Sequence, residues 1–261
     1  MKKETSRQTP GTLFEGMTSV RAVLGAMERG LSDRRVVRIL AADERRIARE
    51  KELGWLARMG EKHGFPIEFL PEEELDGMTV GATHGGIAAE CTDRTIPPLT
   101  EASPSPDGFW IMLEGIEDPY NFGYALRSLY ACGADGVVLS PRNWMSAAGV
   151  VCRSSAGASE LLPAFVSEPT SSARFFRERG YRVAAAGIRN SVSSFEADLS
   201  RPLYLLVGGE KRGLSAELLS EADAVVRIDY GREFPGSLSS ASAASMLGYE
   251  VLRQNGRPSD E

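Results

Sequence analysis

The sequence predicts a two-part α/β protein, and three observations point to it. Short apolar runs alternate with amphipathic stretches along most of the chain, which is typical of strands and helices packed in layers. A proline-rich stretch, residues 92–108, separates an N-terminal part from a larger C-terminal part. Glycine-rich segments follow several of the C-terminal apolar runs, where α/β proteins bind ligands. We therefore expect a ligand site made of loops at strand ends.

Composition sets limits on the class of protein. The chain has 261 residues, of which 42% are hydrophobic and 25% charged, enough for two domains of an ordinary soluble protein. No run approaches the roughly 18 apolar residues of a membrane span, and the polar start lacks a signal core. The three cysteines have no CxxC spacing and the two histidines lie far apart, which disfavours disulfides and metal sites. We expect a cytoplasmic protein without a metal or a membrane partner.

The N-terminal part shows two helix patterns and two apolar runs. Ile47, Leu53 and Leu56 fall on the predicted inward face of the second helix. The elements expected are a helix at 17–30, a strand at 36–41, a helix at 43–64 and a strand at 65–70.

Arginines gather in this part, although the net charge of −6 argues against a nucleic-acid partner. Two interpretations stay open. The arginines form a basic face, or they pair with nearby carboxylates at helical spacing. The arginines are Arg34, Arg35, Arg38, Arg45, Arg46 and Arg49, and the carboxylates Asp33, Asp43, Glu44 and Glu50.

The C-terminal part is predicted to contain a parallel sheet covered on both faces, because its apolar runs are short, continuous and separated by helix-like stretches. The predicted strands are 109–115, 136–140, 161–166, 181–187, 203–209 and 224–228, and the helices 121–132, 169–180 and 238–254. We expect domains at residues 1–96 and 109–261, joined by a linker at 97–108.

Taken alone, the glycines say little about a ligand. The segment GGEKRG, residues 208–213, follows an apolar strand and is either a phosphate cradle or a tight turn. Its glycines do not match GxGxxG, and the chain has no GxxxxGK[ST]. Neither a dinucleotide site nor a P-loop is therefore predicted, which disfavours a nucleotide-dependent oxidoreductase.

Three segments together resemble the motifs of the SpoU (TrmH-like) family of RNA ribose methyltransferases, in the SPOUT superfamily. They are DPYNFGYALR (118–127), VGGEKRGL (207–214) and IDYGREFPGSLSSASAAS (228–245). The matching positions are Asn121, Gly123, Arg127, Gly208, Glu210, Ile228, Gly236, Ser237 and Leu238. More loosely, residues 17–41 and THGGIAAE (83–90) resemble the family's small substrate-binding domain, in which His84 and Gly86 would be structural.

The resemblance implies a fold, a cofactor and partners. The fold is a C-terminal α/β SPOUT domain with a deep trefoil knot and a mainly parallel sheet, preceded by a small α/β substrate-binding domain. The cofactor is S-adenosyl-L-methionine (SAM), the substrate is ribosomal or transfer RNA, and the protein is a homodimer. SAM would be held by Gly187, Gly208, Gly209, Ile228 and Leu238.

The resemblance also implies catalytic roles. Arg127 would bind phosphate or stabilise the developing alkoxide, because a guanidinium is a poor proton acceptor. Glu210 would orient Arg127 or the loop, and Asn121 and Ser237 would hydrogen-bond the substrate or the cofactor carboxylate. Asn121 as a helix cap and Glu210 as a surface charge are the structural alternatives.

The third motif departs from the family pattern. Ser239 stands where the family has asparagine, Ala241 where a serine is usual, and Asp229-Tyr230 where Pro-Met is usual. The expected function is a SAM-dependent RNA 2'-O-methyltransferase. The alternative is a catalytically weakened or inactive RNA-binding protein on the same fold.

Overall fold

The computed structural model describes residues 12–80, 83–141 and 147–256. The described residues up to Thr95, together with 147–153, form one compact unit. The described residues of 96–141 and 154–256 form the other. Each unit is described by itself.

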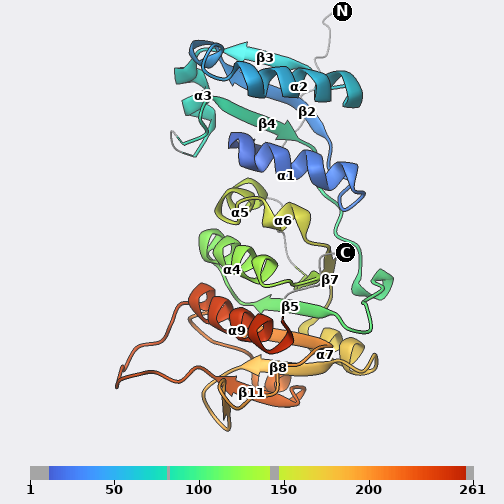
Figure 1. Ribbon diagram of the computed structural model, residues 1–261, viewed down its shortest axis with the longest axis vertical. Helices are drawn as coiled ribbons and strands as arrows, with labels where there is room; N and C mark the ends of the chain where they lie inside the picture. The colour runs from blue at the N-terminus through green and yellow to red at the C-terminus, as the bar shows by residue number, and fades with distance from the viewer. Residues whose placement is uncertain (1–11, 81–82, 142–146, 257–261) are drawn as a thin grey trace, which may run out of the picture. The chain divides into compact units, whose positions relative to one another are not determined.

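The first unit is a four-stranded mixed sheet with three helices and most of a fourth, α5 (Ala148–Ser154), of which residues 148–153 belong to this unit (Figure 1). The strand order is β1-β4-β2-β3, in which β4 runs antiparallel to both neighbours and β3 runs parallel to β2. The elements are β1 (Thr12–Glu15), α1 (Gly16–Glu28), β2 (Val36–Ala42), α2 (Glu50–His63), β3 (Ile67–Leu70), α3 (Glu72–Met78) and β4 (Ile87–Cys91).

The helix predicted over 43–64 is shorter than expected. A 3-10 turn, η1 (Asp43–Arg45), comes first, and α2 begins only at Glu50. Ile47 is 93% exposed, so its predicted inward position is wrong, whereas Leu56 is buried. The physical reason is that Ile47 is the one large apolar residue in a polar run, and a single such residue gives no stripe to bury. The helix ends at Gly64, which adopts the left-handed conformation of a helix C-terminus.

Most of the clustered arginines are engaged by carboxylates, mainly from distant segments. Arg38 lies 2.6 Å from both Glu68 and Glu90, and Arg45 lies 2.7 Å from Glu72. Of the local pairs that the spacing predicted, Arg46 with Asp43 is present, at 2.7 Å. Pairing is therefore the better interpretation for these residues, and three of the five carboxylate partners, Glu68, Glu72 and Glu90, come from distant segments.

The second unit contains a seven-stranded sheet in which every described pairing is parallel. The predicted mainly parallel sheet is confirmed. The strand order is β7-β6-β5-β10-β8-β11-β9. The strands are β5 (Phe109–Glu114), β6 (Gly136–Leu139), β7 (Ala164–Val166), β8 (Arg182–Ala186), β9 (Val192–Ser193), β10 (Leu203–Gly208) and β11 (Ala224–Arg227). The helices are α4 (Pro119–Ala131), α6 (Ala158–Leu161), α7 (Pro169–Arg177), α8 (Ala216–Ser220) and α9 (Ser240–Asn255).

Helices cover both faces of this sheet, as its apolar strands require. On one face Phe176 of α7 stacks on Tyr204 of β10, with ring centroids 4.2 Å apart. Tyr204 also shares a hydrogen bond with Ser172 of α7, at 2.8 Å. The helices α4 and α9 pack against each other, and Ser245 donates to Ser128 across them, at 2.7 Å (Figure 1).

The proline-rich stretch before β5 packs onto the second unit. It contains a 3-10 turn, η2 (Leu99–Glu101), and Leu99 and Ala102 are buried in the core cluster of the sheet. Pro98 bridges to Val166 of β7. The segment therefore carries core residues, where an extended linker had been expected.

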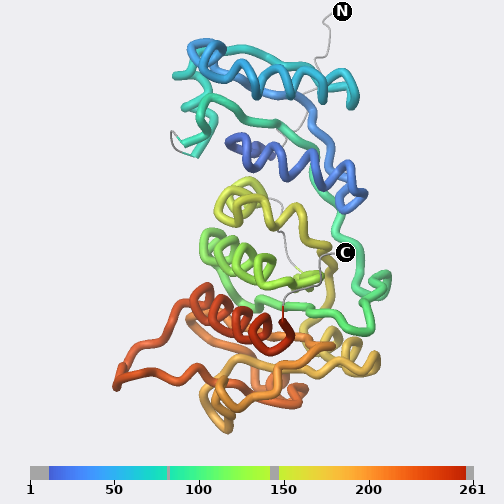
Figure 2. The backbone as a smooth tube through the Cα atoms, viewed as in Figure 1, coloured from blue at the N-terminus to red at the C-terminus, as the bar shows by residue number. Residues whose placement is uncertain are grey.

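A long connection without helix or strand joins β11 to α9. Figure 2 shows it reaching out from the sheet before the chain returns to α9. Among the described residues no helix is long and apolar enough to cross a membrane. The trefoil knot stays a prediction.

Candidate functional site

The first motif forms the start of α4. Asp118 caps this helix, since its carboxylate accepts from the backbone amides of Tyr120 and Asn121, each at 3.2 Å. Pro119 takes the first helical position, where a missing N–H costs nothing. The cap is therefore Asp118, and the side chain of Asn121 is left for another contact.

Glu210 joins three segments that are distant in sequence. Its Oε1 accepts from Asn121 Nδ2 at 2.9 Å and from the backbone amide of Ser240, at the start of α9, at 3.2 Å. Ser240 Oγ in turn donates to the carbonyl of Gly208 at 2.8 Å. Glu210 is an exposed loop residue whose carboxylate connects the starts of α4 and α9.

Two glycines of the second motif are fixed by close backbone contacts. A Cβ on Gly209 would lie 2.1 Å from the carbonyl oxygen of Gly115, and one on Gly208 would lie 2.4 Å from the carbonyl carbon of Gly213. The loops after β5 and β10 therefore touch through their main chains, and only glycine fits there.

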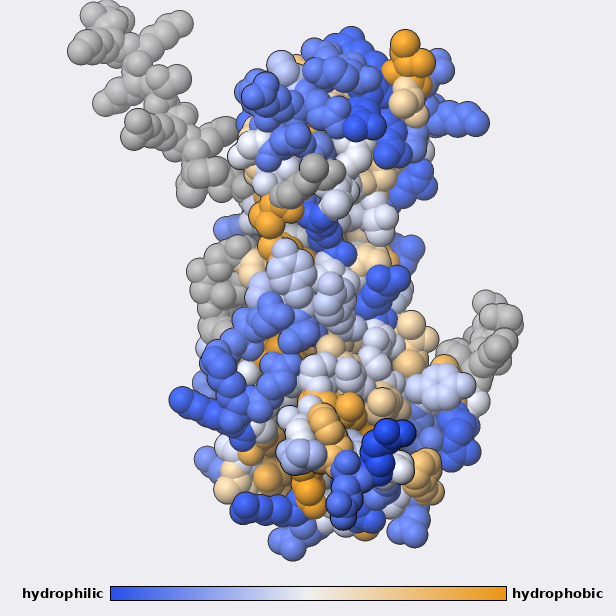
Figure 3. All heavy atoms as spheres, turned by 90° about the vertical axis from the view of Figure 1, so that its left-hand side faces the viewer, coloured by the Kyte–Doolittle hydropathy of each residue, from blue (hydrophilic) through white to orange (hydrophobic). Residues whose placement is uncertain are grey.

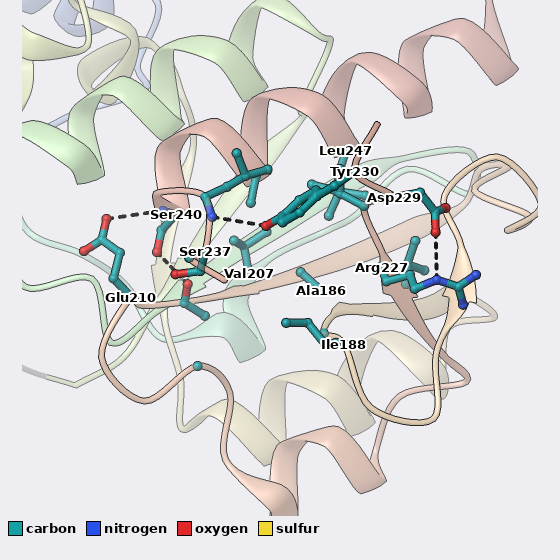
Figure 4. Close-up of a pocket in the computed structure, with 18 of the residues that line it drawn as sticks. Ala186, Ile188, Val207, Glu210, Arg227, Asp229, Tyr230, Ser237, Ser240 and Leu247 are labelled. Carbon is teal, nitrogen blue, oxygen red and sulfur yellow. Dashed lines mark hydrogen bonds and ion pairs between the residues drawn. The ribbon is translucent and has the colours of Figure 1, made fainter. Parts of the chain in front are cut away.

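A pocket of about 580 Å³ opens at the ends of β8, β10 and β11 (Figure 4). The strand ends form one side, and the connection between β11 and α9 forms much of the rest. Seven of the predicted site residues line it, namely Gly187, Gly208, Gly209, Glu210, Ile228, Ser237 and Leu238. Asn121 reaches this group through Glu210, although it is not a lining residue.

Arg127 is placed apart from that group. It lies on α4, exposed, and within the described part of the chain its side chain makes no hydrogen bond or ion pair. Glu210 contacts Asn121 and Ser240, so the expected contact between Glu210 and Arg127 is absent among the described residues. Arg127 is free to meet an incoming anion.

The third motif has its own internal contacts. Ser239, in the position of the family's asparagine, is the N-cap of α9, and its Oγ accepts from the amide of Ser242 at 3.2 Å. Asp229 accepts from Ser193 Oγ and from Arg227 Nε, the latter at 2.9 Å. The Ser193 hydrogen bond, followed by Arg227, lowers the pKa of Asp229 below its ordinary value of 3.8.

Sequence reasoning missed two aromatic residues of the site. Tyr230 and Phe234 line the pocket, with ring centroids 6.0 Å apart. Both lie in the stretch that departs from the family pattern. Aromatic residues at that departure could have been predicted to line the site. Asp118 was also missed, although Asp followed by Pro is a typical helix start.

The histidine predicted to be structural is buried and fully engaged. His84 is 3% exposed, its Nε2 lies 2.6 Å from Asp76 Oδ1, and its Nδ1 accepts from the amide of Gly86 at 3.0 Å. Because Nδ1 accepts, the proton of the neutral ring is on Nε2. Across the described residues, no group of three His, Cys, Asp or Glu side chains is placed to hold a metal ion.

Comparison with known proteins places the chain in a family. The sequence profile of the SpoU rRNA Methylase family matches residues 108–249, more than half of the chain. The chain belongs to the SpoU rRNA methylase family. A second profile, described as RNA 2'-O ribose methyltransferase substrate binding, matches residues 13–97 of this SpoU family member.

Individual relatives agree with that assignment. An uncharacterized tRNA/rRNA methyltransferase of Mycobacterium ulcerans is 31% identical over 73% of this chain. The chain spans 63% of the length of that relative. The putative TrmH family tRNA/rRNA methyltransferase YacO of Bacillus subtilis is 28% identical over 85% of this chain and 90% of its own length. A crystal structure of an AdoMet-bound rRNA methyltransferase from Sinorhizobium meliloti shares the fold, with a TM-score of 0.78, 22% identity, and coverage of 94% of this chain and 88% of that one.

Proposed function

We propose that this SpoU family member transfers a methyl group from SAM to a ribose 2'-hydroxyl of structured RNA, either rRNA or tRNA. The observation that carries the proposal is the pocket at the strand ends, because two of the three motif segments line it and Glu210 ties the first motif to them through Asn121. An RNA-binding protein without catalytic activity would not need this contact between Asn121 and Glu210.

The residues of the pocket fit the cofactor. Its volume of about 580 Å³ lies in the range of small-molecule sites. Main-chain amides and carbonyls at the glycine-rich strand ends that line the pocket can bind the polar edges of an adenosine. Ile228 and Leu238 supply apolar walls. When bound, SAM supplies an electrophilic methyl group on a sulfonium whose leaving thioether is neutral.

The remaining work of the site is to position the hydroxyl and deal with its proton. Arg127 carries a permanent positive charge at an exposed position of α4, which suits the RNA phosphate or the developing alkoxide. Asn121 and Ser237 would hydrogen-bond the substrate or the cofactor carboxylate. Glu210 would act as a positioning residue, because its carboxylate connects the starts of α4 and α9.

RNA contact by residues 1–96 is the proposal for the N-terminal domain, with 97–108 as the connection and 109–261 as the methyltransferase domain. Trp55 of α2 offers a half-buried aromatic ring, and the guanidinium of Arg21 lies 5.1 Å from its centroid. Lys51 and Arg58 are exposed four residues before and three after Trp55, on the same side of the helix. A basic and aromatic surface of this kind suits single-stranded RNA. Trp55→Ala should weaken RNA binding without changing SAM binding.

A homodimer through α4 and α9 is the proposed assembly. These helices pack together and leave Tyr120, Tyr124, Met246 and Tyr249 exposed. Large apolar side chains gathered on neighbouring helices favour a protein partner. Sedimentation should show a dimer that Tyr124→Glu disrupts. A cytoplasmic location stays a prediction.

Transfer of a labelled methyl group from SAM to unmodified RNA tests the proposed function. RNA binding without transfer would favour the alternative, a weakened or inactive RNA-binding protein. The observation behind that alternative is the altered third motif, in which Asp229 and Tyr230 line the pocket.

A further inference from the structure

The connection between β11 and α9, residues 228–239, is held by its own aromatic side chains. The Tyr230 hydroxyl accepts from the backbone amide of Leu238 at 3.3 Å, which closes the loop. The ring of Phe234 packs so closely on Gly236 that a Cβ there would lie 2.6 Å from it. At the start of the loop, Asp229 is anchored by Arg227 at 2.9 Å. Tyr230 is therefore held on two sides: the preceding residue, Asp229, is bound to Arg227, and its own hydroxyl is bound to the Leu238 amide.

Tyr230 also forms a wall of the pocket. It lines the large pocket of about 580 Å³ and an adjoining one of about 300 Å³. Figure 4 shows its ring inside the large pocket, among Ala186, Val207 and Leu247. Figure 3, which views the side from which the loop projects, shows apolar side chains gathered low on this face. Tyr230 is 41% exposed, so it is not buried in the core.

The chemistry of the walls points to a flat ligand group. Among the described residues that line the large pocket, Tyr230 and Phe234 are the aromatic ones, and the strand ends offer glycine and aliphatic side chains. Aromatic side chains stack on nucleobases, whose π faces they match in size and shape. The adenine base is the one aromatic part of the proposed cofactor.

We propose that Tyr230 is the residue by which this chain recognises the adenine base of SAM, its ring supplying the stacking face and its bond to Leu238 holding that face in place. The inference rests on the proposed function. We favour the adenine of SAM over an RNA base as the group that stacks on Tyr230, because the other side of the large pocket consists of the glycine-rich strand ends of the second motif. If an RNA base stacks on Tyr230 instead, the test below distinguishes that result from adenine binding.

Calorimetric titration with SAM, without RNA, tests the proposal. Loss of a stacking face weakens binding about 5- to 150-fold, so Tyr230→Leu and Tyr230→Ala should raise the Kd by at least about fivefold. Tyr230→Phe keeps the stacking face and loses only the hydrogen bond to the Leu238 amide, so its Kd should stay within about threefold of wild type. Methylthioadenosine, which has the adenine but no amino acid part, should show the same loss. Tyr130→Leu is the matched control, because Tyr130 is exposed on α4 and lines neither pocket.

Three results would overturn the inference while leaving the proposed function intact. Tyr230→Leu could bind SAM within twofold of wild type, Tyr230→Phe could lose as much as Tyr230→Leu, or Tyr230→Leu could lose RNA binding alone. Failure of the wild-type protein to bind SAM is a different result, which overturns the proposed function and the inference with it. Because Tyr230 lies in an exposed loop outside the sheet, these variants should keep the wild-type Tm.

Discussion

The side-chain amide of Asn121 donates to the carboxylate of Glu210 at 2.9 Å, although 89 residues separate them in sequence. The same carboxylate oxygen accepts from the amide of Ser240. One side chain thus fixes the start of α4 against the start of α9, beside the pocket.

Removal of the Glu210 carboxylate should loosen this junction. Glu210→Ala removes an acceptor of two hydrogen bonds and is expected to lower the free energy of unfolding by about 1 to 2 kcal/mol. Glu210→Gln keeps the oxygen and should lose less. Urea denaturation measures both, with Glu178→Ala as the control because Glu178 is exposed and distant in the sequence from the motifs. If Glu178→Ala and Glu210→Ala lower the free energy of unfolding equally, the stabilising role of the Glu210 contacts is wrong.

The serine that replaces the family's asparagine should be important for stability as a helix cap. Ser239→Ala is expected to lower the free energy of unfolding by about 1 kcal/mol, since the amide of Ser242 loses its acceptor. Ser239→Asn should stay within a few tenths of wild type, because asparagine caps equally well. Thermal unfolding can compare them with Ser171→Ala, which changes an exposed serine of α7. If Ser239→Ala and Ser171→Ala have the same thermal stability, the proposed stabilising role of the Ser239 cap is wrong.

The close main-chain contact at Gly209 should not accept a side chain. A Cβ there would lie 2.1 Å from the carbonyl oxygen of Gly115, so Gly209→Ala is expected to cost roughly 2 kcal/mol or more, or to prevent folding. Gly77→Ala in α3 is the control, because its Cβ would meet nothing within 4 Å. That variant should be neutral or gain up to about 1 kcal/mol. A Gly209→Ala protein as stable as wild type would contradict the contact.

The anchor at Asp229 should depend on pH in one direction. Its pKa is lower in the folded protein than its ordinary value of 3.8, so folding favours the charged form. The resulting stability is present above pH 3.8 and is lost as the pH falls through the folded pKa. The difference in stability between wild type and Asp229→Asn should therefore be constant from about pH 5 to 8 and shrink below about pH 4. A difference that grows on acidification would have the wrong sign.

The sheet could be predicted because parallel strands buried on both faces leave continuous apolar runs. All six predicted C-terminal runs contain a strand, although β7 is limited to Ala164–Val166. Short or polar elements were missed, including β1, α3 and β9, because they bury too little apolar surface to leave a pattern. The helix break near Ile47 shows the same limit, since long-range arginine pairs replace apolar burial there.

Part of the pocket lining could be predicted from the sequence, because some of its residues directly follow predicted strands. Glycines and Glu210 of the motifs come together at the strand ends, as expected from their positions after β8 and β10. The partners of these residues were not predictable, because contacts such as Asn121 with Glu210 join residues that nothing in the sequence links. Tyr230 shows the converse case. A residue that departs from the motif still lines the pocket.

The most direct test is methyl transfer by the purified protein to unmodified rRNA and tRNA, with SAM carrying a labelled methyl group and the products mapped for ribose methylation. The wild-type protein should place the label on a ribose 2'-hydroxyl. Arg127→Ala should lose at least about tenfold in turnover while its Kd for SAM stays unchanged. Binding of both SAM and RNA without any transfer, or transfer to a base in place of a ribose, would contradict the proposed function.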